Sequence, residues 1–496
     1  MKKALLILLS LLTALIVMVS CDNAVDYPFD DDVPAVETPE MVPLTFEFIK
    51  DGSIKISNIP EGMKYIRNSD AKQNVPEDGI INAEGGDRIK LFATRNSAES
   101  KNNLNIKCTS TDICYVYGNV MSLINEEGFA DKKDVFNYAF KELFKGNEKI
   151  NLHDSKKLVL PATSLADCCY EEMFYGCTSL KSAPALPAQS LTKGCYKYMF
   201  YRCSSLTSAP ELPSMTLATT CYFYMFAECT SLTTAPKLPA TTLATSCYSC
   251  MFRGSGLTTA PKLPATTLAD KCYFSMFNHC ISLIDAPNLP AENLAEDCYS
   301  FMFKNCSSLT KIPAILPAQT LAPYCYVEMF SGCTSLTHPP KLPATAMSDN
   351  CYEGMFEGCE NLLEAPELPA ESLAYCCYYL MFDGCKKLKT APELPATTLN
   401  PYCYNSMFKE CTSLTTAPEL PATTLAAECY GEMFCGCSNL KSITCLATDI
   451  SADNCTSYWV LGVSSSGTFT KAATADWSVK YRSYEGIPSG WTVINQ

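Results

Sequence analysis

The residues with the greatest chemical potential in this chain are its cysteines, which number 30 among 496 residues. Most of them recur in the motif Cys-Tyr-x-x-Met-Phe-x-x-Cys, of which eleven copies follow one another at a spacing of about 26 residues from Cys169 onward. Cysteines in such numbers are typical of disulfide frameworks, thiolate–metal sites or reactive nucleophiles. Because near-identical copies recur so often, we predict a repeated structural role rather than one reactive centre.

The spacing of the motif cysteines leaves two interpretations open. Within one repeat they are eight residues apart; a helical segment would separate them by about 12 Å, beyond the roughly 7 Å between Cα atoms that a disulfide spans. Between neighbouring repeats the separation would be only about 5 Å, so serial disulfides between repeats are allowed. We favour stacked, buried thiols, because free cysteine behaves as a small hydrophobe. In the fourth copy the second cysteine is missing, with Ser255 nearby, while Cys247 remains, which argues against pairing within a repeat.

Other candidate chemistry is sparse. Cys108 and Cys114 flank a short loop that a disulfide would close, with free thiols the alternative. Cys247 and Cys250 form an isolated Cys-x-x-Cys, too weak a pattern to predict a metal or redox site. We therefore expect no enzyme and no catalytic, cofactor-binding or metal-binding residues. The chain has three histidines, none of which recurs in the repeats: His153, His279 and His338.

The fixed period predicts a solenoid, in which each repeat buries its apolar side only against its neighbours. Counted from the first cysteine, the constant apolar residues occupy positions 1, 2, 5, 6 and 9. At 100° per residue these positions fall on one arc, so the motif predicts a short amphipathic helix. Glycine at position 8 in six copies predicts that the helix ends there. The following Leu-x-x-Ala-Pro-x-Leu-Pro segment predicts a parallel strand of about two to four residues, because proline removes ladder hydrogen bonds.

These residues resemble a known family. The succession of Phe, Gly-Cys-Thr-Ser-Leu and Leu-Pro over roughly residues 139–454 is similar to the BspA-type leucine-rich repeat of bacterial surface proteins. Met stands where that family usually has Ala before Phe, Cys replaces Ile at position 1, and the proline turn is longer. The resemblance implies an α/β, leucine-rich-repeat-like solenoid of short helices and short parallel strands.

The segments outside the array predict further parts. We expect a small antiparallel β domain at 44–107, including a hairpin at Asp51-Gly52, because alternating apolar runs flank that dipeptide. A cap with a divergent repeat is expected at 108–168, the eleven repeats at 169–454, and a C-terminal cap at 455–496. The C-terminal cap holds all three tryptophans, for which a small β cap is the simpler interpretation and a sugar-stacking site the alternative: Trp459, Trp477 and Trp491.

The N-terminal segment predicts export. Residues 1–21 combine two lysines, a short apolar run and a small residue before Cys21, as in a secretory signal. The cysteine resembles the acylated residue of a bacterial lipoprotein, so residues 1–21 are expected to be the signal peptide and Cys21 the lipidation site. An ordinary signal peptide is the alternative. Residues 22–43 carry seven acids and no lysine or arginine, which predicts a flexible acidic tether.

The variable residues locate the expected function. A net charge of −14 disfavours a nucleic-acid partner. We expect a protein or glycan ligand, contact with the membrane only through the lipid anchor, and a place on the surface of a bacterial outer membrane. As the resemblance implies, adhesion is the leading hypothesis; a structural envelope spacer and a glycan-capture accessory for nutrient uptake are the alternatives. The candidate ligand ribbon is the exposed row at position 17, whose change from lysine to glutamate is either a recognition gradient or drift: Glu211, Lys237, Lys262, Asn288, Lys341, Glu367, Glu393 and Glu419.

Overall fold

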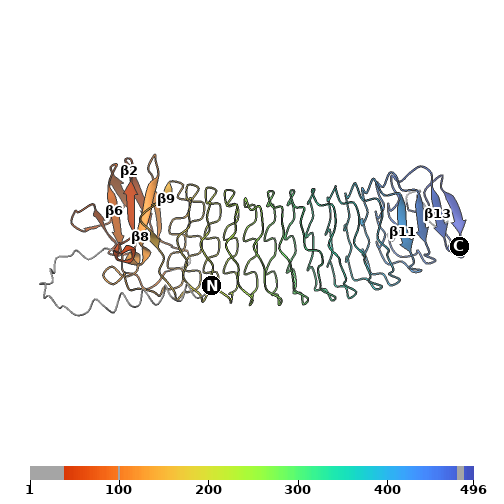
Figure 1. Ribbon diagram of the computed structural model, residues 1–496, viewed down its shortest axis with the longest axis horizontal. Helices are drawn as coiled ribbons and strands as arrows, with labels where there is room; N and C mark the ends of the chain where they lie inside the picture. The colour runs from red at the N-terminus through yellow and green to blue at the C-terminus, as the bar shows by residue number, and fades with distance from the viewer. Residues whose placement is uncertain (1–37, 99–100, 478–484) are drawn as a thin grey trace, which may run out of the picture. The chain divides into compact units, whose positions relative to one another are not determined.

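The computed structural model describes residues 38–98, 101–477 and 485–496. The predicted signal peptide, Cys21 and most of the predicted tether therefore lie outside the described residues. Residues Pro39 to Gln496 form one compact unit, in which an N-terminal pair of sheets leads into a succession of coils, one for each repeat (Figure 1). Among the described residues, no helix is long and apolar enough to cross a membrane.

The N-terminal part consists of two sheets that share a core. After the short 3-10 helix η1 (Pro39–Met41), the larger sheet has the order β10-β8-β1-β6-β3-β4, with β9 also paired to β8, and the smaller sheet has the order β5-β2-β7. Pairs among β1 to β8 are antiparallel, which agrees with the alternation of apolar and polar residues. The strands are β1 (Thr45–Phe48), β2 (Gly52–Ser57), β3 (Lys64–Arg67), β4 (Gln73–Asn74), β5 (Ile80–Ala83), β6 (Arg88–Phe92), β7 (Asn105–Cys108), β8 (Cys114–Asn119), β9 (Ile150–Leu152) and β10 (Leu158–Val159).

The predicted hairpin at Asp51-Gly52 is wrong. β1 pairs with β6 and β8, whereas β2 pairs with β5 and β7, so the chain crosses from one sheet to the other at this point. The two apolar faces, which include Phe46 and Ile54, are thereby buried in one core. Packing of two sheets explains the departure, because a two-residue hairpin would keep both strands in the same sheet.

The antiparallel sheets run past residue 107 and join the first coil. β8 pairs in parallel with β9 and β10, which belong to the coil preceding Cys169. η2 (Val120–Leu123) follows β8 and is buried. Phe46 in β1 packs edge-on against Phe144 of that coil at 6.0 Å. The sheets therefore cover the end of the stack, which would otherwise present an apolar coil to water.

The predicted short helices are wrong. Over the motif, hydrogen bonds alternate between those that close a turn and those that join neighbouring coils. Glu171 and Met173 donate to the carbonyls three residues before them, whereas Tyr170, Glu172 and Phe174 donate to carbonyls of the next coil. The motif is thus a succession of overlapping turns, and its backbone hydrogen bonds hold the coils together instead of a helix.

The reason for the error lies in the period. Positions 1, 5 and 9 and positions 2 and 6 recur every four residues, which nine residues of sequence cannot distinguish from a helical period of 3.6. In the structure every fourth residue is left-handed: φ is 53° at Cys168, 57° at Glu172 and 71° at Gly176. Glycine at position 8 marks one of three such positions in each coil, not the end of a helix.

The left-handed residues give a first prediction. Gly358 has φ of 67°, and a Cβ added there would come no closer than 3.8 Å to any neighbour. Gly358→Ala therefore tests backbone conformation alone, and we expect it to lower the free energy of unfolding by about 1 kcal/mol. Urea unfolding followed by circular dichroism measures the change, with the exposed Asn288→Ala as control. An unchanged midpoint would contradict the left-handed assignment.

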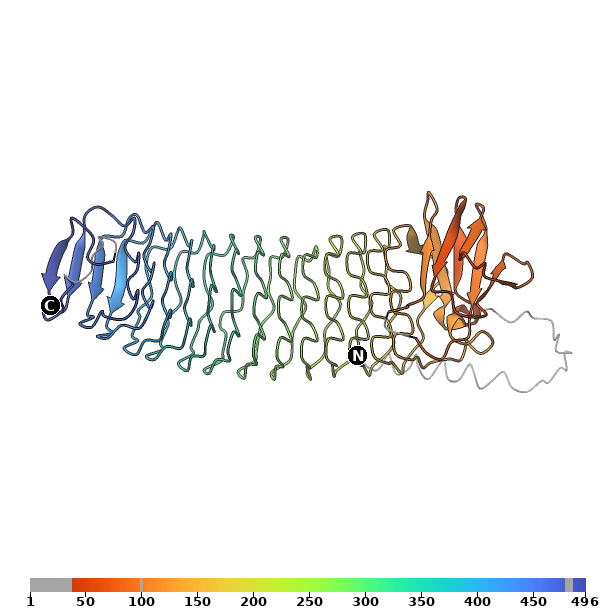
Figure 2. The same cartoon turned by 180° about the vertical axis from the view of Figure 1, so that it is seen from behind.

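In the proline-rich coils, parallel pairing between neighbouring coils is mostly limited to isolated bridges. In most coils the parallel contact is a single bridge, such as Ser182 with Ser208 or Asp285 with Lys311. A regular parallel sheet forms at the C-terminal end (Figure 2), and its strands from Ser442 onward contain no proline. The strand before them contains Pro418, and its pairing shifts register between Thr416 and Glu419. The strands of this sheet are β11 (Thr416–Leu420), β12 (Ser442–Cys445), β13 (Thr468–Lys471) and β14 (Thr492–Asn495).

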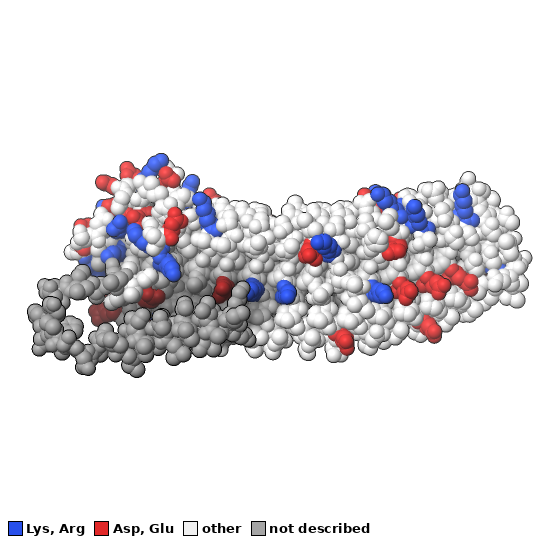
Figure 3. Space-filling model, viewed as in Figure 1, with Lys and Arg blue, Asp and Glu red and all other residues white. Residues whose placement is uncertain are grey.

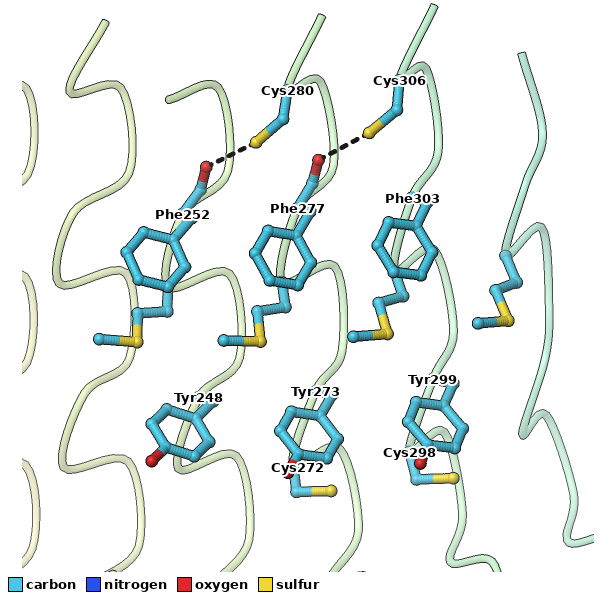
Figure 4. Close-up of a cluster of buried hydrophobic side chains, with 14 of the residues drawn as sticks. Tyr248, Phe252, Cys272, Tyr273, Phe277, Cys280, Cys298, Tyr299, Phe303 and Cys306 are labelled. Carbon is cyan, nitrogen blue, oxygen red and sulfur yellow. Dashed lines mark hydrogen bonds between the residues drawn. The ribbon is translucent and has the colours of Figure 1, made fainter. Parts of the chain in front are cut away.

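The core is a set of parallel ladders running from coil to coil (Figure 4). Phe277 stacks between Phe252 at 5.8 Å and Phe303 at 5.5 Å, and tyrosines at position 2 stack in the same way. The cysteine at position 9 donates its S–H to the phenylalanine carbonyl of the preceding coil; for Cys306 and the Phe277 oxygen the distance is 3.1 Å. The described cysteines are free thiols, so the stack needs no covalent link between coils.

Two details of the core revise local expectations. Ser255 occupies the position of the missing second cysteine in the fourth copy, because its N–H donates to Phe252 as a motif cysteine would. The deletion falls after it at Gly256, where a Cβ would lie 2.2 Å from the Thr230 oxygen.

Trp459 is buried and stacks on Trp477 at 5.6 Å. Buried in this way, Trp459 and Trp477 belong to the core rather than to a sugar-stacking surface.

Candidate functional site

The most repetitive residues are unavailable for chemistry. Burial raises the pKa of the Cys177 and Cys195 thiols to about 12, which keeps both protonated near neutral pH. A protonated, buried thiol is neither a nucleophile nor a metal ligand. Among the described residues, no group of three or more His, Cys, Asp or Glu side chains is placed to hold a metal ion.

The other sequence candidates are dispersed. Cys250 is buried beside Ser249, with 3.8 Å between the sulfur and the hydroxyl oxygen. The His153 ring accepts hydrogen bonds from the backbone N–H groups of Ser155 and Lys156. The remaining two histidines hydrogen-bond to polar side chains: His279 to Asn278 and Asn305, and His338 to Thr337. These residues do not come together in one site.

The predicted ribbon, in contrast, is a continuous exposed surface. All eight of its residues are exposed, while the leucine that follows each one is buried. This alternation arises because each residue lies in the extended Pro-x-Leu-Pro segment, where successive side chains point to opposite faces. Figure 3 shows the resulting row on one face of the coils, where blue side chains are followed by red ones toward the C-terminal end.

The charged residues of the ribbon are unpaired among the described residues, whereas several charges on the turns form ion pairs. On the turns, lysines pair with glutamates of the same or a neighbouring coil, as Lys197 does with Glu171 at 3.1 Å and Lys409 with Glu432 at 2.6 Å. Within the described part of the chain, none of the seven charged ribbon residues forms an ion pair. Unpaired like charges along one row repel one another weakly, so an opposite charge from a partner would be favoured there.

A groove adjoins the N-terminal end of the ribbon, and no pattern in the sequence indicates it. One section, of about 640 Å³, is lined by Leu158, Pro161 and Pro187, with Lys156 and Lys157 at its edge. It shares Pro187 with a second section of about 400 Å³, which Glu211 of the ribbon also lines. The proline-rich segments of the first coils thus provide an apolar surface beside a charged one.

Counting positions at a fixed repeat period misses one residue of the ribbon. The coil that begins at Cys298 has an additional residue, so counting at a fixed period arrives at Ala314. The parallel bridge instead pairs Ile315 with Lys341, and the Ile315 side chain is 44% exposed. The insertion, visible as a spacing of 27 residues between Cys298 and Cys325, was the signal that would have identified it.

Stacked coils joined by parallel bridges, with a leucine in every coil core, define a leucine-rich-repeat solenoid. A family model described as the BspA type leucine-rich repeat region matches residues 153–284, 245–389 and 350–455. These matches together cover more than half of the chain, which therefore belongs to the BspA-type leucine-rich repeat family. Proteins of this type are generally found on bacterial surfaces.

Similarity beyond the family is low. Among solved structures, a crystal structure of a leucine-rich repeat protein from Bacteroides ovatus ATCC 8483 is similar to this chain, with a TM-score of 0.35 and 16% identity over 81% of this chain and 98% of that one. A similarity of that size carries no argument about function. The curated proteins give no match to this chain.

Proposed function

We propose that this protein is a lipid-anchored adhesin of the bacterial outer membrane whose ribbon binds protein or glycan ligands on other surfaces. The observation that supports this function is the row of exposed, unpaired charges on a rigid, proline-framed face. A ligand can occupy such a row without disturbing the core, because each charged side chain alternates with a buried leucine.

Anchoring is the second part of the proposal. Cys21 would carry the acyl chains, and residues 22–38 would hold the coils away from the membrane. Residues 39–43, the end of the predicted tether, instead belong to the compact unit, where Pro43 bridges to Asn119. Growth with a labelled fatty acid would transfer label to the wild-type protein and not to Cys21→Ser. Label on both proteins, or on neither, would contradict acylation at this cysteine.

The ribbon lysines give the test of ligand binding. The triple change Lys237→Glu, Lys262→Glu and Lys341→Glu should weaken binding of an acidic ligand at least tenfold, because three attractive charges become repulsive. Binding of the purified protein to arrays of matrix proteins and glycans identifies the ligand, and titration then measures the loss. The matched control reverses three exposed lysines away from the ribbon, which changes net charge equally: Lys107, Lys193 and Lys387.

The outcomes separate the candidate functions. Unchanged binding by the ribbon variant would exclude these lysines as the ligand site. Binding to polysaccharides alone would favour glycan capture for nutrient uptake over adhesion. The absence of any ligand, together with loss of envelope integrity in cells without the protein, would favour a structural spacer.

A further inference from the structure

The charges along the ribbon are arranged so that lysines toward one end match glutamates toward the other end. Numbering the coils from Cys169, the lysines belong to coils 3, 4 and 7 and the glutamates of the C-terminal half to coils 8, 9 and 10. Two lysines thus lie in coils 3 and 4 and two glutamates in coils 9 and 10, while Glu211 in coil 2 and Lys341 in coil 7 do not follow this order. When the direction of the row is reversed, the lysines of coils 3 and 4 come opposite the glutamates of coils 10 and 9.

We propose that the protein associates with a second copy of itself, face to face and antiparallel, through this ribbon. A two-fold axis in the contact plane and perpendicular to the stack reverses the coil order but keeps each row opposite the same row of the partner. Setting coil 3 opposite coil 10 places Lys237 against Glu419 of the second copy and Lys262 against its Glu393. The symmetry repeats both pairs, which makes four ion pairs, and Asn288 comes opposite Glu367.

Other arrangements are less favourable. In a parallel pair every lysine would face a lysine and every glutamate a glutamate. In the antiparallel pair, a shift of one coil would set Glu211 against Glu419. The chosen register leaves two symmetry-related like-charge contacts in the adjacent row, between Asp285 and Glu364, and Lys311 in the coil next to Asp285 offsets them.

Exposed aliphatic side chains gather near the same axis. Ile284 is 45% exposed, Ile315 44% and Leu363 42%. Ile284 and Leu363 hold equivalent positions in coils 5 and 8, so the axis that pairs the charges also places them opposite one another. Ile315 comes opposite the stem of Lys341. Large aliphatic side chains in water are typical of contact surfaces when they lie together.

The contact should be weak and sensitive to salt. Solvent-exposed ion pairs contribute roughly 0.2–1 kcal/mol each, and salt screens them over about 10 Å at 0.1 M. We therefore expect the dissociation constant to increase at least tenfold between about 0.05 M and about 0.5 M NaCl. A dimer of this kind would be favoured by low salt and by high protein concentration, in solution as on a crowded surface.

The antiparallel direction determines which molecules meet. The two N-terminal ends lie at opposite ends of the pair, so two copies anchored near their N-termini would meet from facing membranes rather than within one. This consequence depends on the proposed anchoring at Cys21, whereas association in solution does not. The structure thereby assigns a specific partner, the same protein on a neighbouring cell, to the proposed adhesive function.

Charge exchange provides the test, with sedimentation velocity of the purified protein as the readout. Lys237→Glu should weaken the dimer at least tenfold, because two ion pairs become repulsive. Adding Glu419→Lys in the same chain should restore the wild-type dissociation constant within about threefold, since the exchanged charges attract again. Adding Glu367→Lys instead changes net charge identically but leaves the introduced glutamate opposite Glu419, so it should not restore the dimer.

Each result of the charge-exchange experiment either supports or overturns the antiparallel dimer. A protein that stays monomeric in low salt, or a dimer that these substitutions do not affect, would overturn the proposal. Equal rescue by Glu419→Lys and Glu367→Lys would overturn the register and with it the antiparallel pair. The rescued variant also separates the two functions: it should dimerise while its binding of an outside acidic ligand remains reduced, so either function can fail without the other.

Discussion

Raising the pH from 8 to 10 is expected to unfold the coils. Burial raises the pKa of nine thiols from the ordinary 9.0 to about 12, because the thiolate cannot be solvated in the core. These thiols are Cys177, Cys195, Cys247, Cys298, Cys351, Cys359, Cys403, Cys437 and Cys445.

The direction of the change in stability with pH follows from which state of the protein, folded or unfolded, loses protons. Below pH 9 the thiols are protonated in both folded and unfolded chains, so their stabilising effect is fully present. Between pH 9 and 12 only the unfolded chain releases protons, and stability falls. At pH 10 each thiol lowers the free energy of unfolding by on the order of 1 kcal/mol, and the nine together by on the order of 10 kcal/mol, which is comparable with the whole stability of a typical domain.

Thermal unfolding followed by circular dichroism measures this effect across the pH range. The control is a triple variant, Cys298→Ala, Cys351→Ala and Cys403→Ala, which is less stable at pH 8 but should lose about one third less stability on going to pH 10, because three of the nine thiols are removed. A melting temperature that stays constant up to pH 11 would show that the thiols are not buried as free cysteines. Disulfides between coils would produce that result.

Phe277→Ala should destabilise the protein by about 3–5 kcal/mol, the second-largest effect that we expect. The Phe277 ring is fully buried between the rings of Phe252 and Phe303, and its neighbours are fixed by hydrogen bonds between coils. A cavity there cannot close without breaking the stack. Asn288→Ala, an exposed change in the same coil, should alter stability by less than about 0.5 kcal/mol.

Phe277→Ala is also expected to destabilise only part of the stack of coils. Each coil contacts only its neighbours, so the loss of one ring should weaken the coils around Phe277 and leave the distant coils protected. Hydrogen exchange measured by mass spectrometry should therefore show faster exchange near Phe277 and unchanged exchange near Phe434. Uniformly faster exchange would mean that the coils unfold as one unit.

The repetition in the sequence predicted much of this architecture because the core positions are constant. Cys, Tyr, Met, Phe and Cys recur in every complete copy, and the structure buries each of them, as in Cys169, Tyr170, Met173, Phe174 and Cys177. The local conformation could not be predicted in the same way. A four-residue turn period and a helical period give the same five apolar positions, and only the hydrogen bonds to the next coil distinguish them.

Long-range contacts explain the remaining differences. Asp51-Gly52 has the residues of a hairpin turn, yet the packing of two sheets directs β1 and β2 apart, and no local signal records that. The eight ribbon positions are exposed because they alternate with buried leucines, and ligand binding at them stays a prediction. Ile315 was missed because one inserted residue changes the register, and a fixed count does not detect such a change.

The constant residues hold the coils together, and we propose that the residues that change from coil to coil bind partners. Ligand binding by a variant in which all eight ribbon residues are serine tests this division of roles most directly. We predict wild-type circular dichroism and melting temperature, together with at least a hundredfold loss of affinity for the ligand that the arrays identify. A variant that unfolds, or one that keeps its affinity, would contradict that division.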